Sequence, residues 1–445
     1  MRPGHSAVET PQGELFGVEL AHLLDLSHPL VRLSARMNWG AIDEALSPCF
    51  HERQGAPAKP TRLMAGLHYL KSTYDLSDEE VVARWVENPY WQYFCGAKYF
   101  EHALPIDPSS MTRWRNRVGE EGIQSLLQRT IETAIATRVV NEQSFTKLNV
   151  DTTVQEKAIV FPTDAKLYCA MRQRLVLLAR ELGLPLRQSF VRLAKKTLIQ
   201  ANRYAHAGQM KRKRKAQRQL KTYLGRVVRD IERQLKASSD THPELAQALA
   251  MAHRLLTQER KDTHKLYSIH APEVECISKG KVHKRYEFGV KVSLVSTSKE
   301  GLILSSQALH GNPYDGHTLA ASLKDAEKHC NRPLRGDIFV DQGYRGHDYQ
   351  GPAAVHLAGR STRRMTAAFK RWYKRRAAIE PLIGHLKTDG RLDRNYLKGT
   401  LGDKINAVLC ACGQNMRLLL NRAAFFLRLV AALLHFQTPR LAFLY

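Results

Sequence analysis

The fold is decided by two short apolar runs, TKLNVDTTV at residues 146–154 and DIFVDQGYRG at residues 337–346. A short apolar run bounded by polar residues is typical of a buried β-strand. Asp151 closes the first apolar run and Asp341 closes the second. Because strand ends hold side chains rigidly, the two aspartates are suitable components of one site.

The remaining strand signals lie at residues 286–297, 301–311 and 352–359, with a helix expected at residues 317–330. The first two of these strands form a hairpin across the linker SKE. Together these elements predict a mixed α/β core, formed by residues 146–166 and 267–400.

Residues 21–145 carry helical signals and predict an all-helical N-terminal domain, after a mobile N-terminus at residues 1–20. The stretch SDEEVVARWVEN begins with a capping box from Ser77 to Glu80 and continues as an amphipathic pattern. Short helices of this kind are consistent with a DNA-binding domain.

The most basic helix of this region is expected within DPSSMTRWRNRVGEEG, with Ser109 or Ser110 as its cap. It carries Arg113 and Arg115, and a basic third helix resembles the reading helix of a helix-turn-helix unit. Basic helical faces are also common on solvated surfaces, so both interpretations stay open.

Residues 167–266 predict a helical insertion with an unusual charge. Residues 171–266 hold 23 Lys or Arg and 7 Asp or Glu. The charge is densest at Lys211, Arg212, Lys213, Arg214 and Lys215, within KRKRKAQRQLK. A helix with such a face suits a phosphate backbone, and a solvated helix without a partner is the alternative.

The whole chain of 445 residues has 68 Lys or Arg and 42 Asp or Glu, a net charge of +26. This excess favours a polyanionic partner, above all nucleic acid. An anionic membrane surface is the rival, but we expect no membrane association because the N-terminus lacks an apolar signal segment.

The C-terminal region, residues 401–445, is apolar at helical spacing and predicts helices that pack on the sheet or on a second subunit. Its most apolar part, residues 418–436, is interrupted by Arg422 and Arg428 and does not suit a membrane span. The seven cysteines show no paired spacing typical of a zinc site. Because the chain shows no secretion signal, they fit a reducing cytoplasm.

A third carboxylate lies in the basic stretch RRMTAAFKRWYKRRAAIEPLIGHLKTDGR, residues 363–391. Tyr373, Arg376, Glu380 and Lys387 follow at spacings of three, four and seven, which predicts one face of a helix. One carboxylate among cations on a single face suits a metal ion held against a phosphate.

The three carboxylates Asp151, Asp341 and Glu380 suit two Mg²⁺ ions, which prefer oxygen ligands and retain waters. Two such ions activate the attacking oxygen and stabilise the leaving oxygen of a phosphodiester. Each carboxylate also has an ordinary interpretation, because Asp151 and Asp341 suit turns or helix caps and Glu380 can pair with Arg376. Nearby rivals are Asp164, Asp337 and Asp348.

The four residues Tyr373, Arg376, Glu380 and Lys387 resemble the Tyr-Arg-Glu-Lys signature of bacterial insertion-sequence DDE transposases. Further blocks resemble the insertion-sequence-five-like branch of that family: NPYWQYFCG, IDPSSMTRWRNRVGEEG, NVDTTVQEKAIVFPTDAKL, HGNPYDGHTL and VDQGYRGHDY. The resemblance covers about residues 60–420. The chain departs from it in the long helical segment that separates Asp151 from Asp341 by 190 positions.

The resemblance implies an RNase H-like catalytic core in which Asp151, Asp341 and Glu380 bind two Mg²⁺ ions, with Mn²⁺ as a substitute. It implies an endonuclease that cuts double-stranded DNA at the terminal inverted repeats of its transposable element. The exposed 3′ ends are then joined to target DNA. By this analogy, DNA is bound by Tyr373, Arg376 and Lys387. The resemblance also implies a homodimer in the synaptic complex. The implied location is the bacterial cytoplasm, with the nucleoid.

Three alternatives stay open. One is a catalytically inactive, sequence-specific DNA-binding protein on a transposase scaffold. Another is a different RNase H-like nuclease, and the tight spacing of the four-residue set disfavours it. The last is a tyrosine recombinase using Tyr373, whose chemistry does not require the acidic trio.

Overall fold

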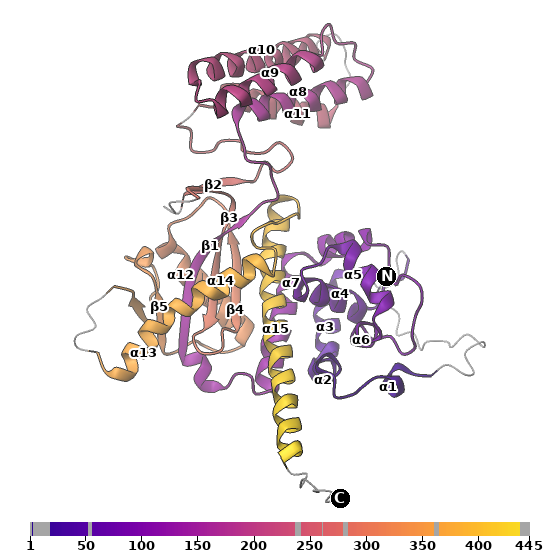
Figure 1. Cartoon of the computed structure of the whole chain (residues 1–445), viewed down its shortest axis with the longest axis vertical. Coiled ribbons are helices and arrows are strands. Elements are labelled where there is room, and N and C mark those ends of the chain that lie inside the picture. Colours follow the sequence, from indigo (N-terminus) through magenta and orange to yellow (C-terminus); the bar gives the residue numbers. More distant parts are fainter. Residues whose placement is uncertain are drawn as a thin grey trace, which may run out of the picture. The chain divides into compact units, whose positions relative to one another are not determined.

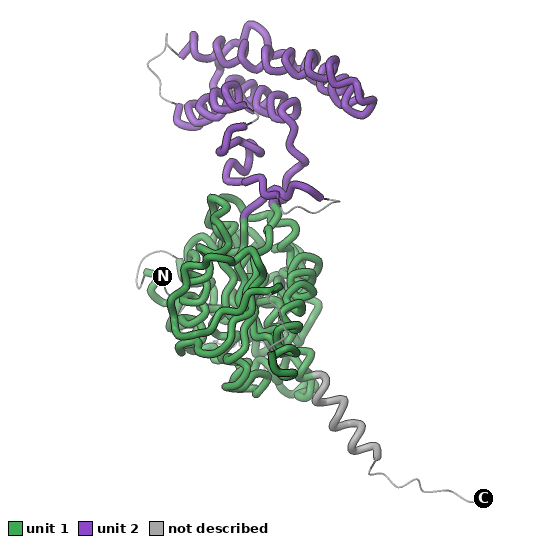
Figure 2. Tube along the Cα trace, turned by 90° about the vertical axis from the view of Figure 1, so that its left-hand side faces the viewer, with its two compact units in different colours: residues 1–156, 291–445 green, residues 157–290 purple. Residues whose placement is uncertain are grey.

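The computed structural model describes residues 2, 18–51, 56–235, 242–259, 261–278, 284–359 and 365–436, the last without side chains beyond residue 423. Most of the expected mobile N-terminus, residues 1–20, and residues 437–445 lie outside this range. The chain divides into two compact units (Figure 2). Unit 1 is Met1–Glu156 with Lys291–Tyr445, and unit 2 is Lys157–Val290.

The N-terminal part of unit 1 is helical, as expected. Its helices are α1 (Leu20–Leu23), α2 (Pro29–Arg36), α3 (Trp39–Leu46), α4 (Thr61–Thr73), α5 (Asp78–Glu87), α6 (Pro89–Phe94) and α7 (Ser109–Ala136). The predicted capping box is confirmed, because Ser77 and Glu80 exchange hydrogen bonds at the start of α5.

The helix α7 differs from its prediction at its first turn. It begins at Ser109, and the Asp107 carboxylate accepts the Ser109 N–H at 2.9 Å, so neither serine is the cap. An aspartate two residues earlier supplies the same acceptor in an Asx turn. Gly119, with φ of 64°, kinks α7 within the stretch in which the sequence predicts a helix.

Unit 1 also contains most of a mixed six-stranded sheet. The strands are β1 (Lys147–Glu156), β2 (Glu275–Ser278), β3 (Tyr286–Thr297), β4 (Ile303–Leu309), β5 (Asp337–Val340) and β6 (Ala354–Leu357). Their order is β2-β3-β1-β5-β6, with β4 on β3. The hairpin β3–β4 is antiparallel, as predicted, while β1, β5 and β6 run parallel. The sequence prediction missed β2, whose four residues are too few to show an alternating pattern.

The helices of the core pack on this sheet. They are α12 (Leu319–Cys330), α13 (Ala367–Arg375), α14 (Ile379–Thr388) and α15 (Gly399–Phe436). α14 packs against β1, and α12 packs against β4. α15 contacts β4 as well as α4 and α7, and it runs between the sheet and the N-terminal helices (Figure 1). No helix within the described residues is long and apolar enough to cross a membrane.

Unit 2 is built on a helical bundle with its own core. The helices are α8 (Asp164–Glu181), α9 (Val191–His206), α10 (Met210–Leu235) and α11 (Pro243–Thr257). Buried side chains from all four helices form one cluster, which includes Met171, Ala194, Leu224 and Leu245. Thr163 caps α8 and Asp164 opens it, which explains the aspartate there without catalysis.

Candidate active site

Asp151 and Asp341 come from neighbouring parallel strands in the same register. The pairing of β1 with β5 matches Lys147 to Asp337 and Asn149 to Phe339, an offset of 190 positions. The pairing ends there, and Asp151 and Asp341 each follow two residues later at this edge of the β1–β5 pairing. Asp341 comes directly after β5, as predicted, but the prediction that Asp151 closes its strand is wrong, because β1 continues to Glu156.

The backbone after β5 holds Asp341 in a tight turn. Asp341 caps a 3₁₀ turn, Gln342–Tyr344, and its Oδ1 accepts the Gly343 N–H at 2.8 Å. A Cβ at position 343 would lie 3.0 Å from Asp341 Oδ1 and 3.2 Å from Asp315 Oδ2. A side chain at position 343 would therefore press on both carboxylates, and they would have to shift by a few tenths of an ångström.

Glu380 enters from α14, which packs against β1. The expectation of one continuous helix is wrong, because a 3₁₀ turn, Arg376–Ala378, separates α13 from α14. Pro381 gives the physical reason, since its ring would clash with the carbonyl of Ala377 in a continuous helix. Tyr373 therefore lies on α13, whereas Glu380 and Lys387 lie on α14.

Arg376 joins two of the three carboxylates. Its Nη1 lies 3.8 Å from Asp151 Oδ2, and its Nη2 lies 3.5 Å from Glu380 Oε1. The Asp151 side chain is 16% exposed and the Glu380 side chain is 66% exposed. Asp151 and Glu380 thus flank a single guanidinium group, with Glu380 on the solvent side.

The other two residues of the four-residue set have different surroundings. The Tyr373 hydroxyl donates to the Leu357 carbonyl at 2.6 Å, which ties α13 to β6. Lys387 lies half-buried in the last turn of α14. The Tyr373 hydroxyl is therefore bound within the protein, and its ring is half-buried.

A fourth carboxylate, Asp315, lies beside the two aspartates and was not selected from the sequence. Its Oδ1 accepts hydrogen bonds from Lys291 Nζ at 2.9 Å and from Thr152 Oγ1 at 3.1 Å. No apolar strand precedes Asp315, so the strand-end signal is absent. Lys291 offered a usable signal, because a lysine inside the apolar run YEFGVKVSLVST requires a partner.

The rival carboxylates near Asp341 have structural partners. Asp337 binds Lys147 and His356, and although burial raises the pKa of Asp337, these hydrogen bonds hold it below its usual value. Asp348 is exposed, and its Oδ1 accepts the Ala320 N–H at 3.3 Å. These contacts favour Asp341 as the carboxylate available to a ligand.

The carboxylate oxygens at this edge suit Mg²⁺ or Mn²⁺, because both ions prefer hard oxygen donors. Within the described part of the chain, no three His, Cys, Asp or Glu side chains stand close enough together to hold a metal ion. The Arg376 guanidinium lies between two of the candidate ligands. The donor chemistry fits a divalent cation, and its binding requires these side chains to move.

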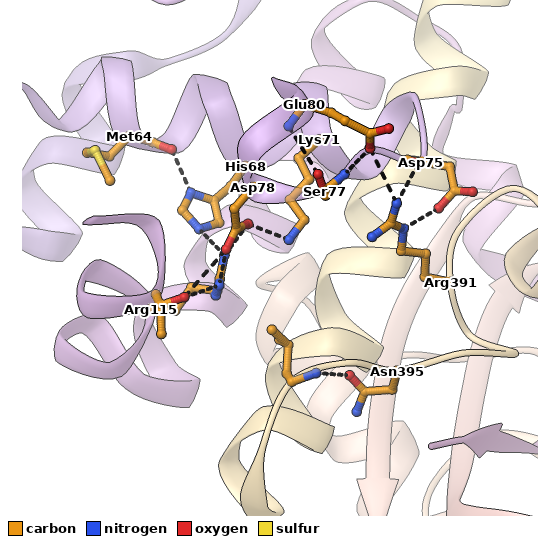
Figure 3. A network of polar contacts seen from close by, with 12 residues as sticks. Met64, His68, Lys71, Asp75, Ser77, Asp78, Glu80, Arg115, Arg391 and Asn395 are labelled. Atoms are coloured by element: carbon orange, nitrogen blue, oxygen red, sulfur yellow. Dashed lines mark hydrogen bonds and ion pairs between the residues drawn. The ribbon is translucent and has the colours of Figure 1, made fainter. Parts of the chain in front are cut away.

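The two arginines expected to contact DNA from α7 have opposite surroundings. Arg113 is exposed, and its Nη2 donates to Ser109 Oγ at 2.6 Å. Arg115 is 2% exposed, and its guanidinium makes two hydrogen bonds to Asp78 at 2.9 and 2.6 Å (Figure 3). The expectation of a DNA contact is therefore wrong for Arg115, because its donors are used inside the core.

Arg115 belongs to a buried polar network between α4, α5 and α7. Lys71 also donates to Asp78, and Arg115 Nη1 lies 3.4 Å from His68 Nε2 (Figure 3). Burial, and then the positive charge of Arg115, lower the pKa of His68 to about 3. Although burial raises it, Arg115 and Lys71 hold the pKa of Asp78 below its usual value. The network therefore consists of oppositely charged side chains that pair in the interior of the N-terminal helices.

The five basic residues of the insertion lie in the first turns of α10, in unit 2. Lys211, Arg212, Arg214 and Lys215 are exposed, and Lys213 is half-exposed. Arg212 donates to Gln209 at 3.0 Å, and none of the five forms an ion pair with a carboxylate of the described residues. Their charges are therefore not neutralised within the bundle.

Comparisons with known proteins identify the family. A Transposase domain (DUF772) model matches residues 18–117, and a Transposase DDE domain model matches residues 257–416. Together they cover more than half of the chain, including Asp341 and Glu380. No solved structure matches the chain.

A curated relative matches part of the chain. The "Uncharacterized protein ORF8 in nfe locus" of Rhizobium meliloti is 49% identical over 209 residues, which are 47% of this chain and 100% of the relative. The chain belongs to the insertion-sequence DDE transposases, a family of enzymes that carry out DNA transposition.

Proposed function

We propose that this transposase binds the terminal inverted repeats of its mobile element, cleaves the DNA and joins the 3′ ends to target DNA by two-metal phosphoryl transfer. In this proposal, Asp151, Asp341 and Glu380 form the catalytic centre of an RNase H-like core. The observation that supports the proposal is the parallel register of β1 and β5, whose pairing ends two residues before Asp151 and two residues before Asp341. Glu380 approaches Asp151 through their shared contact with Arg376.

DDE transposases generally use divalent metal ions, and we propose Mg²⁺ here, with Mn²⁺ as a substitute. Asp151, Asp341 and Glu380 would hold two ions. When bound, the ions supply activation of the attacking oxygen and stabilisation of the leaving oxygen. The middle of β1 would orient Asp151, and the turn directly after β5 would orient Asp341. Glu380, exposed on α14, would close the site from the solvent side.

We propose that the cations near this centre contact double-stranded DNA. Arg376 and Lys387 would bind phosphates near the element end, and Tyr373 would contact DNA through its ring because its hydroxyl is bound to Leu357. Arg113 and the basic turns of α10 would also bind the DNA backbone, since phosphate contacts give affinity without sequence selection. A homodimer would hold two ends, in the bacterial cytoplasm with the nucleoid.

The test is cleavage of a linear duplex that carries the inverted repeat flanking this gene, with Mg²⁺ and with chelator. Asp341→Asn removes one proposed metal ligand and should abolish cleavage and joining while end binding stays near the wild-type level. Asp348→Asn is the matched control, because Asp348 is an exposed aspartate seven positions away, and it should cleave normally. Cleavage by the Asp341→Asn protein would show that the metal site is wrongly assigned.

A further inference from the structure

Asp315 is a carboxylate at the edge of the proposed catalytic centre, outside the set of three. It opens a 3₁₀ turn, Asp315–Thr318, directly before α12. One oxygen of Asp315, Oδ1, is held from two sides by Lys291 and Thr152. Thr152 follows Asp151 on β1, so the carboxylate of Asp315 is tied to the strand that carries the first proposed catalytic aspartate.

The second oxygen of Asp315, Oδ2, faces the turn that holds Asp341. An ideal Cβ on Gly343 would lie 3.2 Å from Asp315 Oδ2 and 3.0 Å from Asp341 Oδ1. One point in space is therefore close to both carboxylates. No hydrogen bond to Oδ2 from another described residue accompanies those to Oδ1.

Lys291 explains how another negative charge is tolerated at this edge. The lysine is 7% exposed within β3, and its Nζ also donates to the Pro313 carbonyl at 2.6 Å. A buried ammonium group is costly without a partner, and Asp315 supplies that partner at 2.9 Å. Lys291 therefore fixes both the charge and the orientation of Asp315.

Tyr344 is a second, independent pointer to a ligand at this place. Its side chain is fully buried, and its hydroxyl makes no hydrogen bond of normal geometry to a described residue, although Ser293 lies close enough to lower its pKa. Burial, and then the negative charges of Asp151, Asp315 and Asp341, raise the pKa of Tyr344. The phenol thus lies near all three carboxylates with an unused polar group, in a place where buried polar groups are normally satisfied.

We propose that Asp315 is a fourth carboxylate of the divalent-cation site, offering Oδ2 on the side of Asp341, and that Lys291 is its positioning residue. This inference rests on the proposed function, because it assigns a further ligand to the same site. An additional carboxylate strengthens binding of a hard cation by adding charge and an oxygen donor. The Lys291 contact leaves Oδ1 occupied and directs Oδ2 to the cation.

The experiment measures Mn²⁺ affinity of the full chain by titration calorimetry, without DNA. Asp315→Asn should weaken Mn²⁺ binding by about 10–100-fold, the range typical when a group supporting a metal site is removed. Asp348→Asn is again the matched control and should bind Mn²⁺ like wild type. Thermal unfolding and circular dichroism of each variant check that the fold is retained.

A double-mutant cycle isolates Lys291. Lys291→Gln should weaken Mn²⁺ binding less than Asp315→Asn does, and the double variant should be no weaker than Asp315→Asn alone, because Lys291 acts through Asp315. Additive losses would overturn the positioning role. If Lys291→Gln does not fold, Thr152→Val removes the other hydrogen bond to Oδ1 and is expected to give the same non-additive result.

Asp341→Asn in the same titration separates the two proposals. A large loss of affinity in Asp341→Asn with no change in Asp315→Asn would leave the proposed function standing and overturn the role of Asp315. Unchanged affinity in both variants would overturn the metal site itself. Losses in both, with Asp348→Asn unaffected, would support a site of four carboxylates.

Discussion

Arg113 and Arg115 lie two positions apart on α7, yet the fold uses them in opposite ways. Arg113 is exposed and bound to its own helix, whereas Arg115 is bound to Asp78 in the core. The sequence could not separate them, because charge and helical spacing do not reveal which cation has a buried partner on another helix. A buried pair is also weak evidence for function, since it serves the core.

We expect Arg115→Ala to lower the free energy of unfolding by about 3–5 kcal/mol, because it leaves the Asp78 carboxylate buried with Lys71 as its remaining cation. Arg113→Ala is the matched control and should change it by less than about 0.5 kcal/mol, as exposed substitutions usually do. Chemical denaturation followed by circular dichroism measures both. Equal effects of the two variants would contradict the structural assignment of Arg115.

The strands and helices around the site differ in how clearly the sequence predicts them. β1, β3, β4 and β5 were predictable from their apolar runs, although Asp151 does not mark the end of β1, which continues to Glu156. The break between α13 and α14 was missed, although Pro381 stands beside Glu380 in the sequence. Asp315 was missed because its place depends on Lys291, which approaches from β3, and such contacts between distant segments leave no periodic signal.

The turn between α13 and α14 places Arg376 beside Asp151 and Glu380, where it would compete with the proposed cation. Arg376→Gln should therefore raise the Mn²⁺ affinity of the DNA-free protein by a few-fold to about tenfold, since Glu380 is largely exposed and its pairing is weak. Titration calorimetry without DNA provides the measurement.

The matched control for this change is Arg375→Gln, one position earlier. Arg375 carries the same charge, but its guanidinium donates to the carbonyls of Ser298 and Lys299 at 2.8 and 2.7 Å. Mn²⁺ affinity should stay at the wild-type level in this variant. An equal rise in both variants would point to a general effect of net charge and not to competition within the site.

At the scale of the whole molecule, unit 2 has its own hydrophobic core and its own concentration of basic residues. The core of its bundle extends from Ala165 to Ile269 and uses side chains of all four helices. We expect a fragment of residues 162–270 to fold alone, because about 100 residues with a contiguous core suffice for a domain. A single cooperative transition in the helical circular dichroism signal is the expected result, and a disordered fragment would contradict it.

The same fragment should bind duplex DNA without sequence preference, with an affinity that falls steeply with salt. Arg214→Gln combined with Lys215→Gln should flatten the plot of log affinity against log salt by about 0.9 for each phosphate that the protein no longer neutralises. Arg180→Gln combined with Lys261→Gln removes the same charge from exposed residues outside the basic turns of α10. This control pair should leave the slope nearly unchanged. If both pairs flatten the slope equally, the DNA affinity depends only on the net charge of the bundle. The basic turns of α10 are then not a specific contact surface.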